Sequence, residues 1–272
     1  MIQAQSHDHH KLSLKNTTSS FTRLPQAQSQ DYHKLIHGYF QSAMSQEFST
    51  DATEEQKAVA RDHWSKTVDG NLDNQTLYDR FSESAKDYDE VITVLNSQGQ
   101  KELATTTAER FPRNRENVRI LDLAAGTGKC SVELRKHGFR KIDALDASEG
   151  MLNVAREKGL YDRYTVGEIG DNTLDAATDA YDAITSSVLN VLVLKKLPIK
   201  AYEEMIRVVK KGGYVIWASY DNGFTDDNPE LADRRKHVRT LEAQGKWKHV
   251  ELRYFRNFVR GKDGGVSVHQ IC

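Results

Sequence analysis

Cysteine is scarce in this chain, which has only Cys130 and Cys272 among its 272 residues. Two cysteines are too few for a disulfide framework, so a reducing compartment is the default expectation. Residues 1–30 also lack an apolar run long enough for a signal peptide or a membrane span. Together these absences predict a cytoplasmic protein with no membrane partner.

A surplus of basic residues is absent too. Lys and Arg number 38 against 39 Asp and Glu, which gives a formal net charge of -1. Proteins that bind a phosphate backbone generally carry a basic surplus, so we expect no nucleic-acid partner. The mean hydropathy of -0.67 is low for a compact domain. The chain is therefore expected to combine one substantial core with a polar extension.

The polar extension is expected at the N-terminus. Residues 1–30 are rich in Ser, Gln, His and Thr and predict a disordered tail, because they cannot bury enough apolar surface to offset the entropy of ordering. Its three clustered histidines, His7, His9 and His10, lie in a solvated polar tail in which no rigid site is expected, so we expect no bound metal. Residues 31–74 recover helical spacing and predict a helical arm, either covering a site or simply packing on the core.

The most informative segment is the run from Ile120 to Lys129. Apolar residues lead to Asp122, and a turn of small residues with Gly126 and Gly128 follows at once. A buried parallel strand that turns directly into a helix, leaving room for a ligand, has this pattern. A second acid, Asp146, closes the next apolar run. A glycine-rich turn followed at this interval by an acid that binds a ribose is typical of nucleoside-cofactor sites in open α/β sheets.

Two cofactors compete for such a turn. A nicotinamide dinucleotide site requires G-x-G-x-x-G/A, and here Ser131 stands at the third small position, which disfavours a dinucleotide oxidoreductase. The pattern D-x-A-x-G-x-G from Asp122 to Gly128 instead resembles motif I of the Rossmann-like, class I S-adenosylmethionine-dependent methyltransferases. Further blocks resemble that family in the same order, over roughly residues 115–220. They are 146–152, 166–171, 181–187 and 207–216, the last with Lys211 where the family usually has proline.

The alternation of elements predicts an α/β fold with a parallel sheet and right-handed crossovers. The expected strands are near 118–123, 141–145, 164–167, 181–186, 213–219, 247–260 and 265–271, and the expected helices near 128–138, 148–158, 173–178, 199–210 and 229–245. A helix from about residue 75 precedes them, and residues 96–115 are polar. The family resemblance implies a mostly parallel seven-stranded sheet flanked by helices, ending in a C-terminal antiparallel hairpin. This S-adenosylmethionine-binding domain is expected to span 75–272.

A narrower resemblance concerns the segments 77–89 and 237–247, on either side of this core. Together they are similar to the methyltransferase-like proteins of the Williams–Beuren syndrome chromosomal region. That resemblance suggests a subfamily and implies no particular methyl acceptor.

The family resemblance also implies roles for individual residues. Asp146 would accept hydrogen bonds from the ribose hydroxyls, Glu168 would bind the adenine amino group, and Ile169 and Met151 would enclose the ring. Asp122 would lie near the methionine amino group or orient the glycine turn. The complete expected set for S-adenosyl-L-methionine is Tyr88, Asp122, Ala124, Gly126, Gly128, Asp146, Ala147, Met151, Glu168, Ile169 and Ser186.

The aromatic residues of the helix from residue 75 allow two interpretations. In related enzymes an N-terminal aromatic helix closes over the cofactor, which would give Tyr88, and less directly Tyr78, a role in binding. Aromatic residues at helical spacing also pack in cores, and both interpretations stay open here.

The sequence contains fewer features that indicate the methyl acceptor. No residue lies in a recognisable general-base motif, and His137 and His269 qualify by residue type alone. The fourth-strand block lacks D/N-P-P-Y/F/W, the signature associated with methylation of nucleobase and some protein amino groups, so we expect an O, N or S nucleophile of a small molecule. A protein methyltransferase, or a partner protein that binds cofactor without turnover, remains an alternative. The oligomeric state stays open.

Overall fold

The structure is a computed structural model that describes residues 48–67, 72–187, 197–220 and 229–272. All of these belong to one unit, Ser42–Cys272. The tail predicted for residues 1–30, with its three histidines, lies outside the described residues, as do residues 31–47 and 68–71 of the arm predicted for 31–74. No helix in the described part of the chain is long and apolar enough to cross a membrane.

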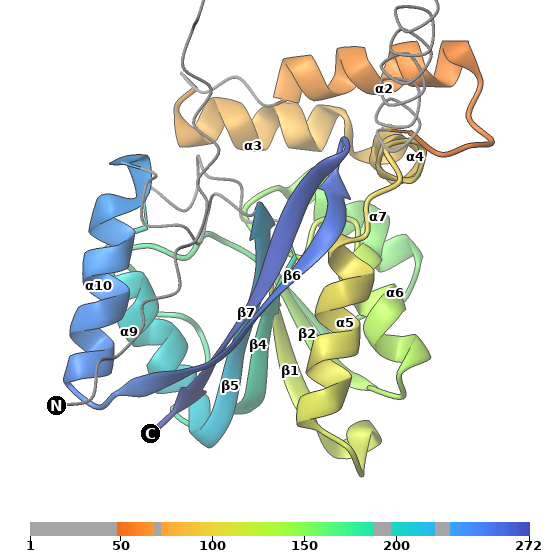
Figure 1. Cartoon of the computed structure of the whole chain (residues 1–272). Coiled ribbons are helices and arrows are strands. Elements are labelled where there is room, and N and C mark those ends of the chain that lie inside the picture. The colour runs from red at the N-terminus through yellow and green to blue at the C-terminus, as the bar shows by residue number, and fades with distance from the viewer. Residues whose placement is uncertain (1–47, 68–71, 188–196, 221–228) are drawn as a thin grey trace, which may run out of the picture. The chain divides into compact units, whose positions relative to one another are not determined.

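A seven-stranded sheet forms the centre of this unit, in the order β3-β2-β1-β4-β5-β7-β6 (Figure 1). Strands β1 to β5 run parallel, and β7 pairs antiparallel with both β5 and β6. The predicted fold class is therefore confirmed, including the terminal hairpin. The strands are β1 (Arg119–Leu123), β2 (Lys141–Asp146), β3 (Arg163–Val166), β4 (Tyr181–Ser186), β5 (Val209–Tyr220), β6 (Trp247–Val259) and β7 (Lys262–Ile271).

Helices cover both faces of the sheet and its carboxyl edge. In Figure 1, α9 and α10 lie on one side of the sheet and α5 and α6 on the other, while α2 and α3 lie above the strand ends. Buried apolar residues fill both interfaces, because parallel strands are covered on both faces. The helices are α2 (Glu54–Thr67), α3 (Asn74–Glu83), α4 (Ala85–Val94), α5 (Gly99–Arg110), α6 (Lys129–Lys136), α7 (Glu149–Glu157), α9 (Ile199–Val208) and α10 (Ala232–Ala243).

Side-chain caps fix the starts of three helices around the carboxyl edge. Thr53 and Gln56 exchange side-chain to backbone hydrogen bonds at the start of α2, which forms a capping box. The Asp73 carboxylate accepts from the Thr76 N–H at the start of α3, and Ser148 Oγ accepts from the Met151 N–H at the start of α7. These caps satisfy backbone N–H groups that have no partner within the helix.

The predicted elements differ from the structure in three places. The helix expected from residue 75 is two helices, α3 and α4, which meet at Ser84. Residues 173–178 are not helical: the side chains of Glu204 and Arg207 bind the backbone of this segment at Leu174 and Ala176, so its polar groups are satisfied without helical turns.

The third difference is α5, which the sequence did not predict. Its polar residues Gln100, Thr106 and Thr107 are buried against the sheet and α6. Thr107 satisfies its hydroxyl by donating to the Leu103 carbonyl one turn earlier. Because buried positions are filled by polar side chains, the apolar period that reveals an amphipathic helix is absent.

Candidate functional site

The turn after β1 has the backbone conformation that its small residues predict. Ala124, Gly126 and Gly128 all have positive φ, at 53°, 55° and 88°. A Cβ on Gly126 would meet no atom within 4 Å, whereas one on Gly128 would lie 2.4 Å from Leu160 Cδ1. Gly128 is therefore needed for packing under the turn, and Gly126 leaves open space above it. Such space beside a backbone turn is what a closely bound ligand requires.

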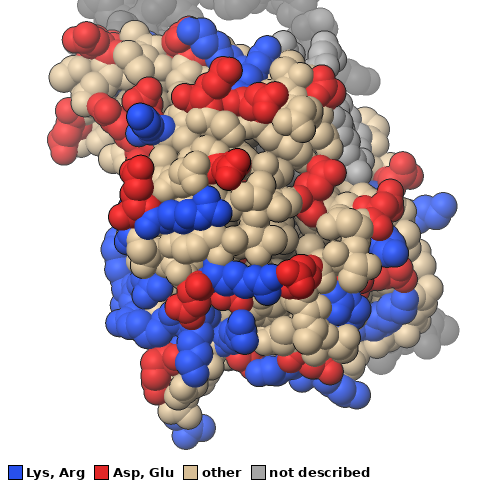
Figure 2. Space-filling model, turned by 180° about the vertical axis from the view of Figure 1, so that it is seen from behind, with Lys and Arg blue, Asp and Glu red and all other residues tan. Residues whose placement is uncertain are grey.

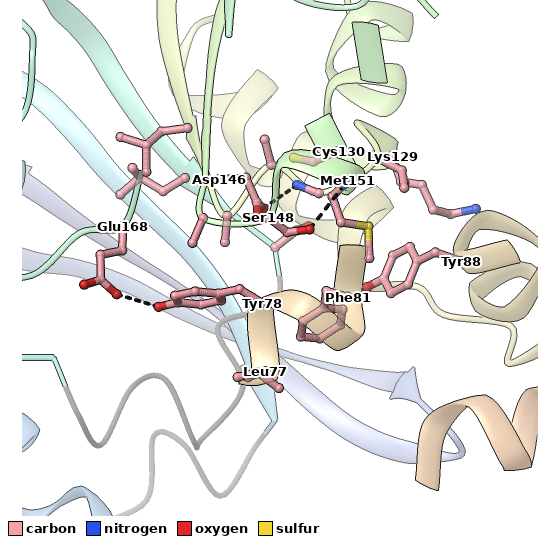
Figure 3. Close-up of a pocket in the computed structure, with 18 of the residues that line it drawn as sticks. Leu77, Tyr78, Phe81, Tyr88, Lys129, Cys130, Asp146, Ser148, Met151 and Glu168 are labelled. Carbon is pink, nitrogen blue, oxygen red and sulfur yellow. Dashed lines mark hydrogen bonds between the residues drawn. The ribbon is translucent and has the colours of Figure 1, made fainter. Parts of the chain in front are cut away.

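Asp146, the last residue of β2, faces this turn. Its Oδ2 accepts from the Gly126 N–H at 2.8 Å and its Oδ1 from the Ser148 N–H at 2.8 Å, so the carboxylate is fixed by two backbone donors (Figure 3). Burial raises the pKa of this carboxyl, and the two hydrogen bonds partly oppose the shift. Each carboxylate oxygen keeps a second acceptor position, which allows Asp146 to bind a pair of ligand hydroxyls as well.

Glu168 and Tyr78 close one end of the same pocket (Figure 3). The Tyr78 hydroxyl, on α3, donates to Glu168 Oε2 at 2.6 Å. Burial, then this hydrogen bond and the glutamate charge, raise the pKa of Tyr78, so the phenol stays protonated as a donor. Ile169, the next residue after Glu168, and Met151 are also apolar residues of the pocket lining. An acid next to apolar surface is the environment expected for a nucleobase with an amino group.

Helix α3 lies against the start of α7 and contributes Leu77, Tyr78 and Phe81 to the pocket wall. Ser82 Oγ lies 2.8 Å from Ser148 Oγ at this contact. A Cβ on Gly150 would come within 2.7 Å of the Ser82 Cα and carbonyl oxygen. Only glycine at position 150 therefore lets the two helix backbones approach this closely.

Helix α4 is tied to the glycine turn through Asp89. The Asp89 carboxylate accepts from Thr127 Oγ1 and from Lys158 Nζ, and Lys158 also donates to the Thr127 carbonyl at 2.8 Å. Lys129 Nζ donates to the Asp89 carbonyl and to Thr93 Oγ1, both at 3.1 Å. These contacts place Tyr88, on the same helix, at the pocket.

The structure brings most of the predicted set together. Lining the pocket are Tyr88, Ala124, Gly126, Asp146, Ala147, Met151, Glu168 and Ile169. Three predicted residues do not line it, namely Asp122, Gly128 and Ser186. Ser186 is buried with its hydroxyl unbonded, and the next residue, Ser187, lines the pocket instead. Successive residues of a strand point to opposite faces, so a shift of one position explains this difference.

Asp122 lies behind the turn, away from the pocket. Its carboxylate is 1% exposed and accepts from Tyr161 Oη at 2.7 Å and Thr185 Oγ1 at 3.0 Å. This geometry supports the orienting role rather than contact with a ligand's amino group. The acid links β1, β4 and the segment before β3 at the point where the glycine turn starts.

Several lining residues were not predicted, among them Trp64 on α2, Gln100 on α5 and Tyr220 at the end of β5. Tyr220 could have been predicted from the sequence, because the carboxyl ends of parallel strands meet at one edge of the sheet. Gln100 could not, since the sequence did not predict its helix. The two histidines considered by type do not line the pocket; His269 lies between Trp217 and Trp247, where burial lowers its pKa to about 3.

Asp122→Asn is expected to change how stability depends on pH. Burial raises the pKa of Asp122 to about 6, against 3.8 ordinarily, although bonds from Tyr161 and Thr185 lower it in part. The protonated acid therefore stabilises the fold fully below about pH 4, and this contribution is lost as pH rises through about 6, by up to about 3 kcal/mol. The asparagine variant should lack this decline in urea unfolding between pH 4 and 7. Parallel profiles for the two proteins would contradict the assignment.

Comparison with known proteins agrees with this geometry. Residues 120–213 match the profile of a family described as a methyltransferase domain. One chain of a solved complex between the Haloferax volcanii Trm112 methyltransferase activator and a methyltransferase shares the fold, with a TM-score of 0.52 at 18% identity, over 71% of this chain and 95% of that one. Residues 120–213 are therefore similar to a methyltransferase domain, and the solved structure has the same fold as this chain. This similarity implies S-adenosylmethionine as the methyl donor.

The similarity to individual curated proteins covers more of the chain than residues 120–213. Human methyltransferase-like protein 27 is 29% identical over 171 residues, 63% of this chain and 66% of that protein. Demethylmenaquinone methyltransferase of Clavibacter sepedonicus is 37% identical, over 50% of this chain and 54% of that protein. Malonyl-[acyl-carrier protein] O-methyltransferase of Pectobacterium atrosepticum is 32% identical, over 56% of each. The match thus spans between half and two thirds of the length of these relatives.

Proposed function

We propose that this chain is an S-adenosylmethionine-dependent methyltransferase that transfers the methyl group to an O, N or S nucleophile of a small molecule. The observation that carries the proposal is the Asp146 carboxylate, fixed by Gly126 and Ser148 beside the open space over the glycine turn. A charged acceptor rigidly held at the tip of the second strand suits the ribose of a nucleoside.

The residues present fit this cofactor. Gly126 leaves room for it, Asp146 keeps acceptor positions for two hydroxyls, and the Glu168 end offers an acid beside apolar side chains. When bound, the cofactor supplies an electrophilic methyl group. The chain's own contribution is to hold donor and acceptor in line and to exclude water, since positioning provides much of the acceleration of such a transfer.

Four observations favour a small-molecule acceptor over a macromolecule. The fourth-strand block lacks the signature of amino-group methylation on nucleobases, and the net charge is -1. Figure 2 shows basic and acidic side chains interspersed on the face that it draws, without the uniformly basic surface that a phosphate backbone requires. The names of the curated relatives above include a methyltransferase for demethylmenaquinone.

The test is an incubation of the protein with metabolite extracts and S-adenosylmethionine labelled in its methyl group. We expect a small-molecule product that gains the labelled methyl in the mass spectrum, and none with an Asp146→Ala variant. Label found only on a protein band would contradict the small-molecule acceptor. Binding of S-adenosylhomocysteine with no labelled product in any extract would instead favour a cofactor-binding protein without turnover.

A further inference from the structure

The pocket is longer than the nucleoside end described above. Asp146 ends β2 and Glu168 follows β3, whereas Tyr220 ends β5, on the other side of β1 and β4 in the strand order. One continuous pocket is lined by all three residues. A cofactor held at the β2 and β3 ends therefore leaves the part toward β5 for a second molecule.

Four aromatic side chains line the same pocket, and we call the part that they form the aromatic end, defined by Trp64, Phe81, Tyr88 and Tyr220. They come from α2, α3, α4 and β5, so four separate elements converge there. Phe81 and Tyr88 pack edge to face with ring centroids 6.3 Å apart. Burial chiefly raises the pKa of Tyr88, and Asp146, Asp89 and Tyr220 add to the shift, so its phenol stays neutral.

The Tyr220 ring is held in place from behind. Phe258 of β6 packs against it edge to face, with centroids 4.9 Å apart. Two glycines make room for Phe258: a Cβ on Gly99 would lie 2.7 Å from its ring, and one on Gly264 would lie 2.5 Å from its Cβ. A ring backed in this way presents a preorganised flat surface to the pocket, which lowers the cost of binding a flat ligand.

The four side chains that define the aromatic end are uncharged, and the nearby cations Lys262, whose Nζ lies 6.0 Å from the Tyr220 ring centroid, and Arg260 do not line the pocket. The charged lining residues are Lys129, Asp146 and Glu168. Lys129 Nζ donates to the Asp89 carbonyl and to Thr93 on α4, and the two acids belong to the nucleoside end. Burial raises the pKa of Tyr220 to about 12, so its phenol stays neutral at neutral pH. A charged ligand would lose its hydration against these rings, and none of the four side chains carries an opposite charge to replace it.

We propose that the aromatic end binds the methyl acceptor, and that this acceptor is an uncharged, planar aromatic molecule. The inference rests on the proposed methyltransferase function. Stacked or edge-on contacts with Trp64, Tyr88 and Tyr220 recognise a flat π-system and discriminate against a saturated ring of the same size. Gln100 is a buried polar residue that lines the pocket; its Oε1 accepts from Ser97 Oγ at 3.2 Å, and its amide N–H groups suit a hydroxyl or carbonyl substituent.

Three probes test the chemistry of this end, titrated into the full chain saturated with S-adenosylhomocysteine. They are 2-naphthol, its saturated analogue decahydro-2-naphthol, and the anion 2-naphthoate. We expect 2-naphthol to bind about tenfold more tightly than either of the other two. Equal binding of the saturated analogue would overturn the aromatic specificity, and tighter binding of 2-naphthoate would overturn the preference for an uncharged ligand.

Substitutions at Tyr220 test whether 2-naphthol binds at the aromatic end. Tyr220→Leu should weaken 2-naphthol binding about three- to tenfold, while Tyr220→Phe keeps the ring and should bind like wild type. Tyr254→Leu, the same kind of change at an exposed position of β6, is the matched control and should have no effect. Affinity for S-adenosylhomocysteine should stay within about twofold in all three.

The experiments distinguish failure of the acceptor-site proposal from failure of the proposed methyltransferase function. Loss of 2-naphthol binding in the Tyr254 control, or no loss in Tyr220→Leu, would place the probe elsewhere and refute the acceptor site while the methyltransferase function stands. Failure of wild-type protein to bind S-adenosylhomocysteine would refute both.

Discussion

Asp146→Ala is expected to weaken binding of S-adenosylhomocysteine by about 100-fold or more. Hydrogen bonds to a charged acceptor contribute about 1.5–3 kcal/mol each, and a ribose would make two of them with this carboxylate. The variant also removes the acceptor that orients the Gly126 and Ser148 N–H groups. Isothermal titration calorimetry of wild type and variant measures the effect, and Asp146→Asn should fall between them because it keeps the shape but loses the charge.

The control for this prediction is Asp182→Ala. Asp182, on β4, also accepts from a backbone N–H, that of Arg119 at 2.8 Å, and pairs with Lys210 at 2.7 Å, but it does not line the pocket. Its loss should lower the melting temperature and leave cofactor affinity unchanged. Affinity of Asp146→Ala within about threefold of wild type would show that this carboxylate does not bind the ligand.

Gly150→Ala is expected to lower affinity for S-adenosylhomocysteine about tenfold by displacing α3. The new Cβ would lie 2.7 Å from the backbone of Ser82, which cannot move without moving the helix. Leu77, Tyr78 and Phe81 would leave their places in the pocket wall with it. The substitution favours α7 itself, because alanine has a higher helix propensity than glycine.

Asn153→Ala separates these two effects. Asn153 lies on α7 but is exposed, so the variant raises helix propensity without approaching α3. Hydrogen exchange over α3 should increase in Gly150→Ala and not in Asn153→Ala. Unchanged exchange and unchanged affinity in Gly150→Ala would show that close packing of α3 on α7 is irrelevant to binding.

The parallel strands could be predicted from the sequence because each is a short apolar run that ends at a recognisable residue. Asp146 and the turn from Ala124 to Gly128 were found in this way, and these residues also position the site. The apolar pattern predicts the strand but not which of the side chains at its end faces the pocket. Ser186 and Ser187 differ by one position and point to opposite faces, and a pattern of apolar residues does not determine which faces the pocket.

Elements that close the pocket from above were harder to predict. Trp64 and Gln100 are distant from the glycine turn in sequence, and only the tertiary packing of α2 and α5 brings them to it. Polar residues such as Thr106 and Gln100 are buried in α5, which conceals the helical period. Asp122 shows the opposite case, since its motif position indicates the site, while its bonds to Tyr161 and Thr185 show that it supports the turn from behind.

The central claim is that a nucleoside-sulfonium cofactor lies across the carboxyl edge of the sheet. Calorimetric titration of the wild-type chain with S-adenosylhomocysteine, and in parallel with NAD, tests it most directly. The account predicts saturable binding of one S-adenosylhomocysteine per chain and no heat from NAD. Saturable binding of NAD with no response to S-adenosylhomocysteine would contradict it.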